Sequence, residues 1–379
     1  MTRRKLLYVT GTRADFGLML PILRALDRSD YFTLELVVAG MHLSPQFGYT
    51  VREVEASELH IAARAKLPIE NDSAAGMAAC AGDMAAFMGS FFSSYRPDIL
   101  LLLGDRSEML ASALPAVVAG IPIVHLCGGE RSGTVDESIR HAVSKLANLH
   151  LVANSDAAGR LVAMGEEPWR IHQVGAPGLV GLRELAQFGR AELLSKYGLD
   201  PSRSYALVLF HPVVQDAEKS GLPVRLALAE LQKTGIQSLC LMPNADHGTG
   251  QIRDELGAVS GGSSVQLVTH MARPDFVSAL AQAALMIGNS SSGIVEAATF
   301  GTPVVNVGDR QHGRLRNSNV IDADPDPVSL AAGIETALRQ PRTAGENIYG
   351  DGQTDARVVE ILANLDWGDP RLLKKQITF

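Results

Sequence analysis

The chain has 379 residues, of which 46% are hydrophobic and 36 are glycine, a composition typical of a globular α/β protein that excludes a disordered or fibrous chain. Its 41 acidic and 34 basic residues give a net charge of −7, which argues against a broad surface for nucleic acid or membrane. The three cysteines are far apart and form no CxxC pair, so neither a disulfide framework nor a cysteine zinc site is expected.

The N-terminal residues are basic and then apolar, in an order that superficially resembles a signal peptide. The apolar run covers only residues 6–9, which is too short for the core of such a peptide. The longest apolar runs elsewhere, such as residues 99–103, end at charged residues and cannot span a bilayer. We therefore expect a cytoplasmic protein with no membrane partner.

Short apolar runs alternate with helical patterns through the first half of the chain. Strands are predicted at residues 5–11, 32–40, 97–105, 121–129 and 149–154. Helices are predicted at residues 15–29, 49–57, 108–120 and 136–147. The run "ILLLL" is apolar throughout, as in strands that are buried on both faces of a parallel sheet. The alternation indicates βαβ units and a doubly wound sheet.

The alternation of strands and helices is interrupted in "IHQVGAPGLVGLREL", where glycines and a proline predict a hinge. It then resumes with strands at residues 205–212, 236–243, 264–270, 285–290 and 302–308. Helices are expected from about residue 224 and at residues 273–283, 293–301 and 355–365. The pattern predicts an α/β fold with two doubly wound Rossmann-like domains, residues 1–175 and 176–360, facing a central cleft. A tail, residues 361–379, is expected near the domain junction.

Two polar residues follow the first two strands, at the sheet edge where doubly wound folds bind ligands. Arg13 lies in "TGTRADFG" and could hold a phosphate with its forked donors, or be an ordinary surface arginine. His42 follows the second strand. No GxGxxG and no GxxxxGK[ST] occurs, so neither a dinucleotide fingerprint nor a P-loop is present.

Three carboxylates occupy equivalent places after later strands. Asp105 follows the third strand, Glu130 follows the fourth behind a glycine pair, and Asp136 begins the next helix. Asp105 could instead cap a helix, and Asp136 with Arg140 four residues on could simply stabilise one. Converging carboxylates that differ in proton affinity can provide both the acid and the base that reaction at a sugar carbon requires.

The second half carries a histidine and a group of possible nucleotide contacts. His211 follows a strand in "LFHP", where a core or capping role is the alternative. A serine-rich turn before a helix suits phosphate, although it could equally be an ordinary N-cap, and a glutamate one turn later could bind ribose hydroxyls. These candidates are Ser290, Ser291, Ser292, Gly293, Glu296 and, after the next strand, Arg310. The histidines show no HxxxH or HExxH spacing, so no metal and no cofactor is expected.

The sequence contains, in this order, the motifs "GTRADFG", "LLLGDRSE", "HLCGGERSGTVDESIRHAVSKL", "LFHPV", "MPNADHG" and "GNSSSGIVEAATFGTPVVNVGDRQHGR". In this order and spacing, they resemble the hydrolysing branch of the UDP-N-acetylglucosamine 2-epimerase family over almost the whole chain. The resemblance implies a GT-B type fold with a sugar-binding, catalytic N-terminal domain and a UDP-binding C-terminal domain. It implies elimination of UDP, addition of water to the resulting glycal, and release of a free 2-epimer for sialic or legionaminic acid synthesis.

The resemblance also implies roles for individual residues. The family's catalytic groups correspond to Asp105, Glu130, Asp136 and His211. Its ribose-binding glutamate corresponds to Glu296, its diphosphate loop to the serines before Gly293, and two positions that line its cleft to Arg13 and His42. The chain departs from the family at Cys127, where the branch usually has histidine. We expect a homodimer whose small-molecule partner is a UDP-sugar.

Two questions stay open at the level of sequence. The substrate could be UDP-N-acetylglucosamine, giving N-acetylmannosamine, or UDP-2,4-diacetamido-2,4,6-trideoxyglucose, giving the corresponding mannose-type sugar. The reaction could also differ, since a GT-B glycosyltransferase would use the same UDP-binding helix with an acceptor, and a non-enzymatic sensor would bind without turnover.

Overall fold

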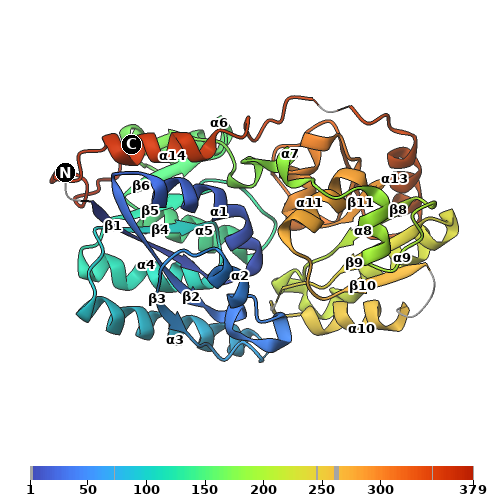
Figure 1. The fold of residues 1–379 in the computed structure, drawn as a ribbon, viewed down its shortest axis with the longest axis horizontal. Helices are drawn as coiled ribbons and strands as arrows, with labels where there is room; N and C mark the ends of the chain where they lie inside the picture. Colours follow the sequence, from blue (N-terminus) through green and yellow to red (C-terminus); the bar gives the residue numbers. More distant parts are fainter. Residues whose placement is uncertain (1–2, 72, 245, 260–263, 344, 379) are drawn as a thin grey trace. The chain divides into compact units, whose positions relative to one another are not determined.

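The computed structural model describes residues 3–71, 73–244, 246–259, 264–343 and 345–378, which form two compact units (Figure 1). The first unit comprises Met1–Arg131, Val135–Val180 and Tyr349–Phe379, and the second comprises Ser132–Thr134 and Gly181–Ile348. The division expected from the sequence assigned residues 176–360 to one domain. By contact, the chain from Tyr349 onward belongs to the first unit, because its helix packs on that unit's core.

The first unit is built on a seven-stranded, all-parallel sheet in the order β3-β2-β1-β4-β5-β6-β7. Its strands are β1 (Arg4–Thr10), β2 (Phe32–Ala39), β3 (Ile61–Ala65), β4 (Ile99–Leu103), β5 (Ile123–Leu126), β6 (Leu149–Val152) and β7 (Ile171–Gln173). The order reverses between β1 and β4, so the carboxyl ends of these two strands flank the switch point where doubly wound sheets bind ligands.

Helices cover both faces of this sheet. They are α1 (Arg13–Arg28), α2 (Val51–Ala56), α3 (Ala74–Ser94), α4 (Ser107–Ala119), α5 (Val135–Leu146), α6 (Ser155–Ala163) and α14 (Thr354–Asn364). Alternate residues of β1 point to opposite faces: Leu6 and Tyr8 join the core under α1, α2 and α14, whereas Leu7 and Val9 join the core under α3, α4 and α5. The inner strands β4, β5 and β6 are therefore buried on both faces, which explains their apolar sequences.

Helix α3 is, within the described residues, the one helix long and apolar enough to cross a membrane by length and composition alone. In the structure it packs along α4 on the first unit's sheet. Its buried residues recur every fourth position, at Gly76, Cys80, Met84, Met88 and Phe92. The opposite side of α3 consists largely of exposed alanines, glycines and serines.

The second unit repeats the architecture with a six-stranded parallel sheet in the order β10-β9-β8-β11-β12-β13. Its strands are β8 (Tyr205–Leu209), β9 (Gln237–Leu241), β10 (Val265–Val268), β11 (Leu285–Gly288), β12 (Val304–Val307) and β13 (Val320–Ala323). Its helices are α7 (Leu182–Leu185), α8 (Arg190–Lys196), α9 (Gly221–Thr234), α10 (Thr249–Val259), α11 (Arg273–Gln282), α12 (Ser291–Val295) and α13 (Pro327–Arg339). Here the order reverses between β8 and β11.

Candidate active site

The turn between β1 and α1 is held by one buried carboxylate. Asp15 accepts the backbone N–H groups of Gly11 at 3.0 Å and Thr12 at 2.7 Å, while the Thr12 hydroxyl accepts the N–H of Asp15 at 3.2 Å. This reciprocal capping box fixes the start of α1. Arg13 is the first residue of that helix and is half-buried beside the switch point of the first sheet.

His42 lies in the short 3₁₀ turn Gly40–Leu43 after β2 and is fully buried. Its Nε2 is hydrogen-bonded to Thr10 Oγ1 at 2.9 Å and its Nδ1 to Thr50 Oγ1 at 2.8 Å. Burial lowers the pKa of His42 below its usual value, so the ring is neutral at pH 7. His42 orders the turn after β1 through these bonds, and its expected contact with substrate stays a prediction.

Asp105 follows β4 and is ion-paired with Arg140 of α5. The Arg140 side chain is 1% exposed and the Asp105 side chain 27%, so the carboxylate is the part of the pair that solvent reaches. The N-cap of α4 is Arg106, so Asp105 does not take the helix-capping role that was its alternative. The opposite charge of a buried guanidinium favours the ionised form of a carboxylate.

Glu130 follows β5 through a glycine pair that allows no side chain. A Cβ on Gly128 would lie 2.9 Å from His125 Nδ1, and one on Gly129, whose φ is +75°, would lie 2.4 Å from the carbonyl oxygen of Ala157. The backbone therefore packs directly on its neighbours, and Glu130 is brought to a buried position. Cys127, the residue before the glycine pair, also has a left-handed backbone conformation, with φ +59°.

The guanidinium of Arg140 in α5 connects the segments that follow β4 and β5. Arg140 pairs with the Asp105 carboxylate and donates from Nη1 to the backbone oxygen of Glu130 at 3.0 Å. Asp136 lies in the first turn of α5, one turn before Arg140, and is half-buried. Arg140 thereby reaches the ends of two neighbouring strands. The three predicted carboxylates thus lie on elements that meet at Arg140.

Two further side chains support this region and were not proposed from the sequence. His125 is fully buried in β5 and joins the Gly104 carbonyl, through Nε2 at 2.7 Å, to the Ser144 hydroxyl of α5, through Nδ1 at 3.1 Å. Burial lowers the pKa of His125 to about 3, so it acts as a neutral bridge. Arg160 of α6 donates to the Gly129 carbonyl. Neither contact leaves a local sequence signal, because both join residues far apart in the chain.

In the second unit, His211 follows β8 at the switch point of that sheet. The amide of Asn289 holds its backbone from both sides: Oδ1 accepts the His211 N–H at 2.7 Å, and Nδ2 donates to the His211 carbonyl at 2.8 Å. Asn289 follows Gly288, where a Cβ would lie 1.9 Å from the Leu209 carbonyl oxygen. Strands β8 and β11 therefore end so close together that glycine is required at residue 288.

The serines and the glycine after β11 have different structural roles. Ser290 is the N-cap of α12, and its hydroxyl lies 2.9 Å from that of Ser292. Ser291 is half-buried at the first position of the helix. A Cβ on Gly293 would lie 2.8 Å from Val304 Cγ1, which shows that this glycine permits close packing of α12 on β12.

Two charged residues complete the predicted nucleotide-binding set. Glu296 is buried at the end of α12 and forms an ion pair with Arg273 of α11, a partner that the sequence analysis did not identify. Arg310 is half-buried after β12 and donates from Nη1 to the Asn289 carbonyl at 3.1 Å. Both elements lie beyond the carboxyl ends of the second sheet's strands.

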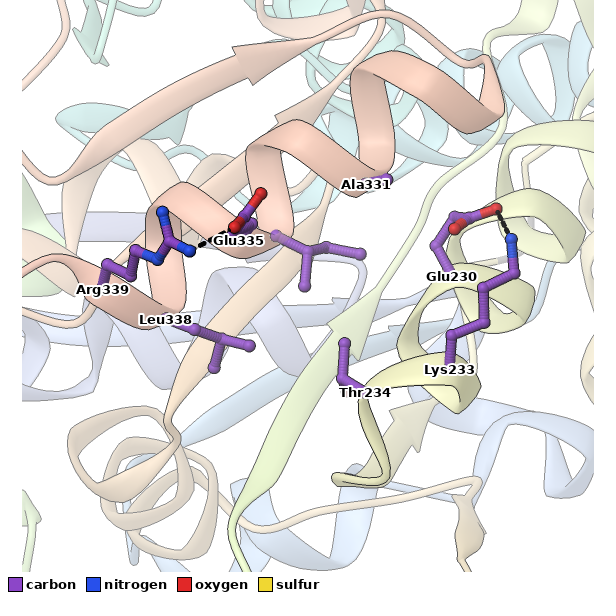
Figure 2. Close-up of a pocket in the computed structure, with 8 residues that line it drawn as sticks. Glu230, Lys233, Thr234, Ala331, Glu335, Leu338 and Arg339 are labelled. Carbon is purple, nitrogen blue, oxygen red and sulfur yellow. Dashed lines mark hydrogen bonds and ion pairs between the residues drawn. The ribbon is translucent and has the colours of Figure 1, made fainter.

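A hollow of about 410 Å³ lies elsewhere on the second unit, between α9 and α13 (Figure 2). Its polar lining includes two ion pairs, Glu230 with Lys233 and Glu335 with Arg339. These residues lie near the carboxyl ends of α9 and α13, and α9 leads directly to the amino end of β9. The hollow is therefore at the opposite edge of the sheet from the predicted site residues.

A family model described as UDP-N-acetylglucosamine 2-epimerase matches residues 24–363. The chain belongs to this family. It is 42% identical to the UDP-N,N'-diacetylbacillosamine 2-epimerase (hydrolyzing) of Legionella pneumophila, over 96% of each chain. It is 32% identical to the UDP-N-acetylglucosamine 2-epimerase of Neisseria meningitidis serogroup B, over 95% of each chain.

The solved structures identify the fold of this 2-epimerase family member. A crystal structure of a Neisseria meningitidis UDP-GlcNAc 2-epimerase bound to UDP-GlcNAc is similar with a TM-score of 0.78 at 16% sequence identity. The alignment covers 95% of this chain and 100% of that one. The fold class predicted from the sequence, two doubly wound α/β units of the GT-B type, is confirmed.

The neutral state of His125 predicts how stability depends on pH. The native ring resists protonation down to about pH 3, whereas the unfolded ring binds a proton below about pH 6.5, so acid favours unfolding between these values. The free energy of unfolding should fall by about 2 kcal/mol more between pH 7 and pH 5 in wild type than in His125→Asn. Urea titrations at the two pH values measure the difference. The exposed control, His60→Asn, should keep the wild-type loss, and an equal loss in His125→Asn would contradict a buried neutral ring.

Proposed function

We propose that this chain is a hydrolysing 2-epimerase that acts on UDP-2,4-diacetamido-2,4,6-trideoxyglucose and releases UDP and the free mannose-type 2-epimer. The observation that carries the proposal is the 42% identity over 96% of the chain to a relative named for hydrolysis of UDP-N,N'-diacetylbacillosamine, against 32% to a relative named for UDP-N-acetylglucosamine. The same similarities favour an epimerase over the glycosyltransferase alternative. We further propose that the reaction takes place in the cytoplasm and supplies a sialic- or legionaminic-type pathway.

The chemistry explains why carboxylates would be needed. The proton on C2 of the sugar is weakly acidic, so a positioned base must remove it as the C1–O bond breaks and UDP leaves as an anion. The product of this elimination is a 2-acetamidoglycal. Water then adds its oxygen to C1 while an acid returns a proton to C2 on the opposite face. No redox step and no change in oxidation state is involved.

We assign this proton transfer to the carboxylates of the first unit. Asp105 is ion-paired with Arg140 and remains partly open to solvent, which suits a group that exchanges protons. Glu130 and Asp136 lie at the end of β5 and the start of α5, which Arg140 joins to the end of β4. Arg13 is proposed to contact the substrate from the start of α1.

We assign UDP to the second unit. Ser290, Ser291, Ser292 and Arg310 are proposed to hold the diphosphate, and Glu296 the ribose hydroxyls. His211 is proposed to act beside the departing diphosphate, since its backbone is fixed by Asn289 at the same sheet edge. Gly293 contributes by letting α12 pack closely on β12.

We also propose that the enzyme is a homodimer. Helix α4 exposes Leu114, Val117 and Val118, with Val118 81% exposed, next to the apolar helix α3. An apolar face of this kind favours protein association. Sedimentation velocity should show a dimer for wild type and weaker association for Val118→Asp, and a wild-type monomer at micromolar concentration would exclude the proposal.

The proposed reaction is tested by incubating the enzyme with each of the two UDP-sugars and no acceptor. We expect one UDP and one free 2-epimerised sugar per substrate consumed, with a higher kcat/KM for the diacetamido sugar. UDP release only on addition of an acceptor would indicate a glycosyltransferase. A preference for UDP-N-acetylglucosamine would contradict the proposed substrate but not the reaction.

The assignment of the ribose contact predicts a binding defect. Glu296→Ala should weaken UDP binding by about 1–3 kcal/mol, because it leaves the ribose hydroxyls without a charged acceptor. Titration calorimetry with UDP measures the change. Glu335→Ala provides the matched control, since Glu335 is an exposed glutamate of the same unit paired only at the surface of α13. Equal affinities in Glu296→Ala and wild type would count against the assignment.

The assignment of the acid and base predicts loss of turnover without loss of binding. Asp105→Asn, Glu130→Gln and Asp136→Asn should each lower kcat by about 10²–10⁴-fold, because an amide preserves size but cannot exchange a proton. Affinity for UDP should stay near that of wild type. Glu137→Gln, the adjacent position on α5, is the control and should be mild. A variant of the three that retains full kcat loses its assigned role.

A further inference from the structure

The last residues of the chain pack against the end of α5 that is remote from Asp136. After α14, residues 371–378 return along the first unit, which we call the C-terminal strap. The Thr378 N–H donates to the Gly165 carbonyl at 2.9 Å, and a Cβ on Gly165 would lie 2.6 Å from Ile377 Cγ2. The strap therefore lies in close contact with the segment between α6 and β7.

Buried polar side chains bind the backbone of this strap. Arg170 is fully buried and donates to the carbonyls of Arg371 at 2.6 Å and Leu372 at 3.0 Å. Asn148 donates to the same Leu372 carbonyl at 2.9 Å and accepts the Ile123 N–H, at the start of β5, at 2.9 Å. The strap is thus fixed to the strand that leads to Glu130.

Lys375 of the strap caps the carboxyl end of α5. Its ammonium donates to the carbonyls of Ser144 at 2.9 Å, Lys145 at 3.0 Å and Ala147 at 2.8 Å. Carbonyls in the last turn of a helix have no partner within the helix, and a cation there also opposes the negative end of the helix dipole. The side chain of Lys375 is 14% exposed, so these bonds are largely shielded from water.

A fully buried carboxylate balances this cation. Glu166 pairs with Lys375 at 2.5 Å, Lys145 at 2.7 Å and His150 at 2.9 Å. Burial would raise the pKa of Glu166, but the hydrogen bonds from His150, Lys145 and Lys375 outweigh it and lower the pKa to about 2. Burial lowers the pKa of Lys375 to about 8, against the opposing effect of Glu166, so the lysine is mostly protonated at pH 7.

The two ends of α5 therefore have different partners. At the amino end lies Asp136, and one turn later Arg140 binds Asp105 and the Glu130 carbonyl. At the carboxyl end lies Lys375. A helix of 12 residues is about 18 Å long and moves as a rigid rod, so a displacement at one end shifts the groups at the other.

We propose that Lys375 is a positioning residue for the reaction: by capping the carboxyl end of α5, it sets the axial position of Asp136 and of the Arg140 bonds to Asp105 and Glu130. The inference rests on the proposed function of Asp136. Lys375 does not contact substrate, and it acts through α5. A misplacement of 1 Å or less at the acid and base is enough to lower the rate by one to two orders of magnitude.

The test compares four variants of the full-length enzyme. Lys375→Met should lower kcat by about 10- to 100-fold, with KM and UDP affinity within twofold of wild type, because the UDP contacts lie on other elements. Lys375→Arg retains a cation with several donors and should restore kcat to within about fivefold of wild type. Lys374→Met, at the adjacent exposed lysine, is the matched control and should leave kcat unchanged. Asp136→Asn reports separately on the proposed function.

The outcomes distinguish the positioning role of Lys375 from the catalytic role proposed for Asp136. Lys375→Met with a lower melting temperature but wild-type kcat would overturn the inference, since a purely structural role predicts that result. If Lys375→Met does not fold, Lys375→Gln replaces it, with the same expected loss and the same overturning result. Full turnover in Asp136→Asn would overturn the proposed function, and with it this inference. An inactive Asp136→Asn beside a fully active Lys375→Met would overturn the inference alone.

Discussion

The arrangement of the first unit depends on one buried cation, Arg140. A guanidinium that is 1% exposed is stable only if its donors are satisfied, and here they reach the Asp105 carboxylate and the Glu130 carbonyl. Removing the Asp105 carboxylate would take away a charged partner of this buried guanidinium, which typically costs several kcal/mol. The ends of β4 and β5 are therefore confined to the positions that Arg140 permits. The same constraint makes the loops that carry Asp105 and Glu130 part of the folded core.

The second unit uses a neutral side chain for a similar purpose. Asn289 binds the backbone of His211 through both of its amide atoms, while its own carbonyl accepts bonds from Arg310 and Gln311. The ends of β8, β11 and β12 are thereby joined at the switch point of that sheet. These hydrogen bonds connect the three strand ends within the protein itself. Both units thus present a preformed sheet edge, which lowers the entropic cost of binding.

Much of this fold could be predicted from the sequence because buried parallel strands are short, apolar and separated by amphipathic helices. For two of the elements that were missed, β3 and α3, the structure gives a physical reason for the weak sequence signal. β3 is a half-buried, alanine-rich edge strand, and α3 has small residues on all sides, which blurs its apolar face. At the site, the sequence located the carboxylates but not the partner of Arg140, since Asp105 is 35 residues away. The burial of His42 and the strap contacts of Lys375 were hidden for the same reason: they are set by tertiary packing.

The most direct test of the account is the fate of the C2 hydrogen during turnover in heavy water. If carboxylates of the first unit remove that proton and a glycal is formed, C2 is reprotonated from groups in exchange with solvent. Mass spectrometry and proton NMR of the released sugar should then show one deuterium at C2. A product that fully retains its original C2 hydrogen would contradict elimination, and with it the roles assigned to Asp105, Glu130 and Asp136.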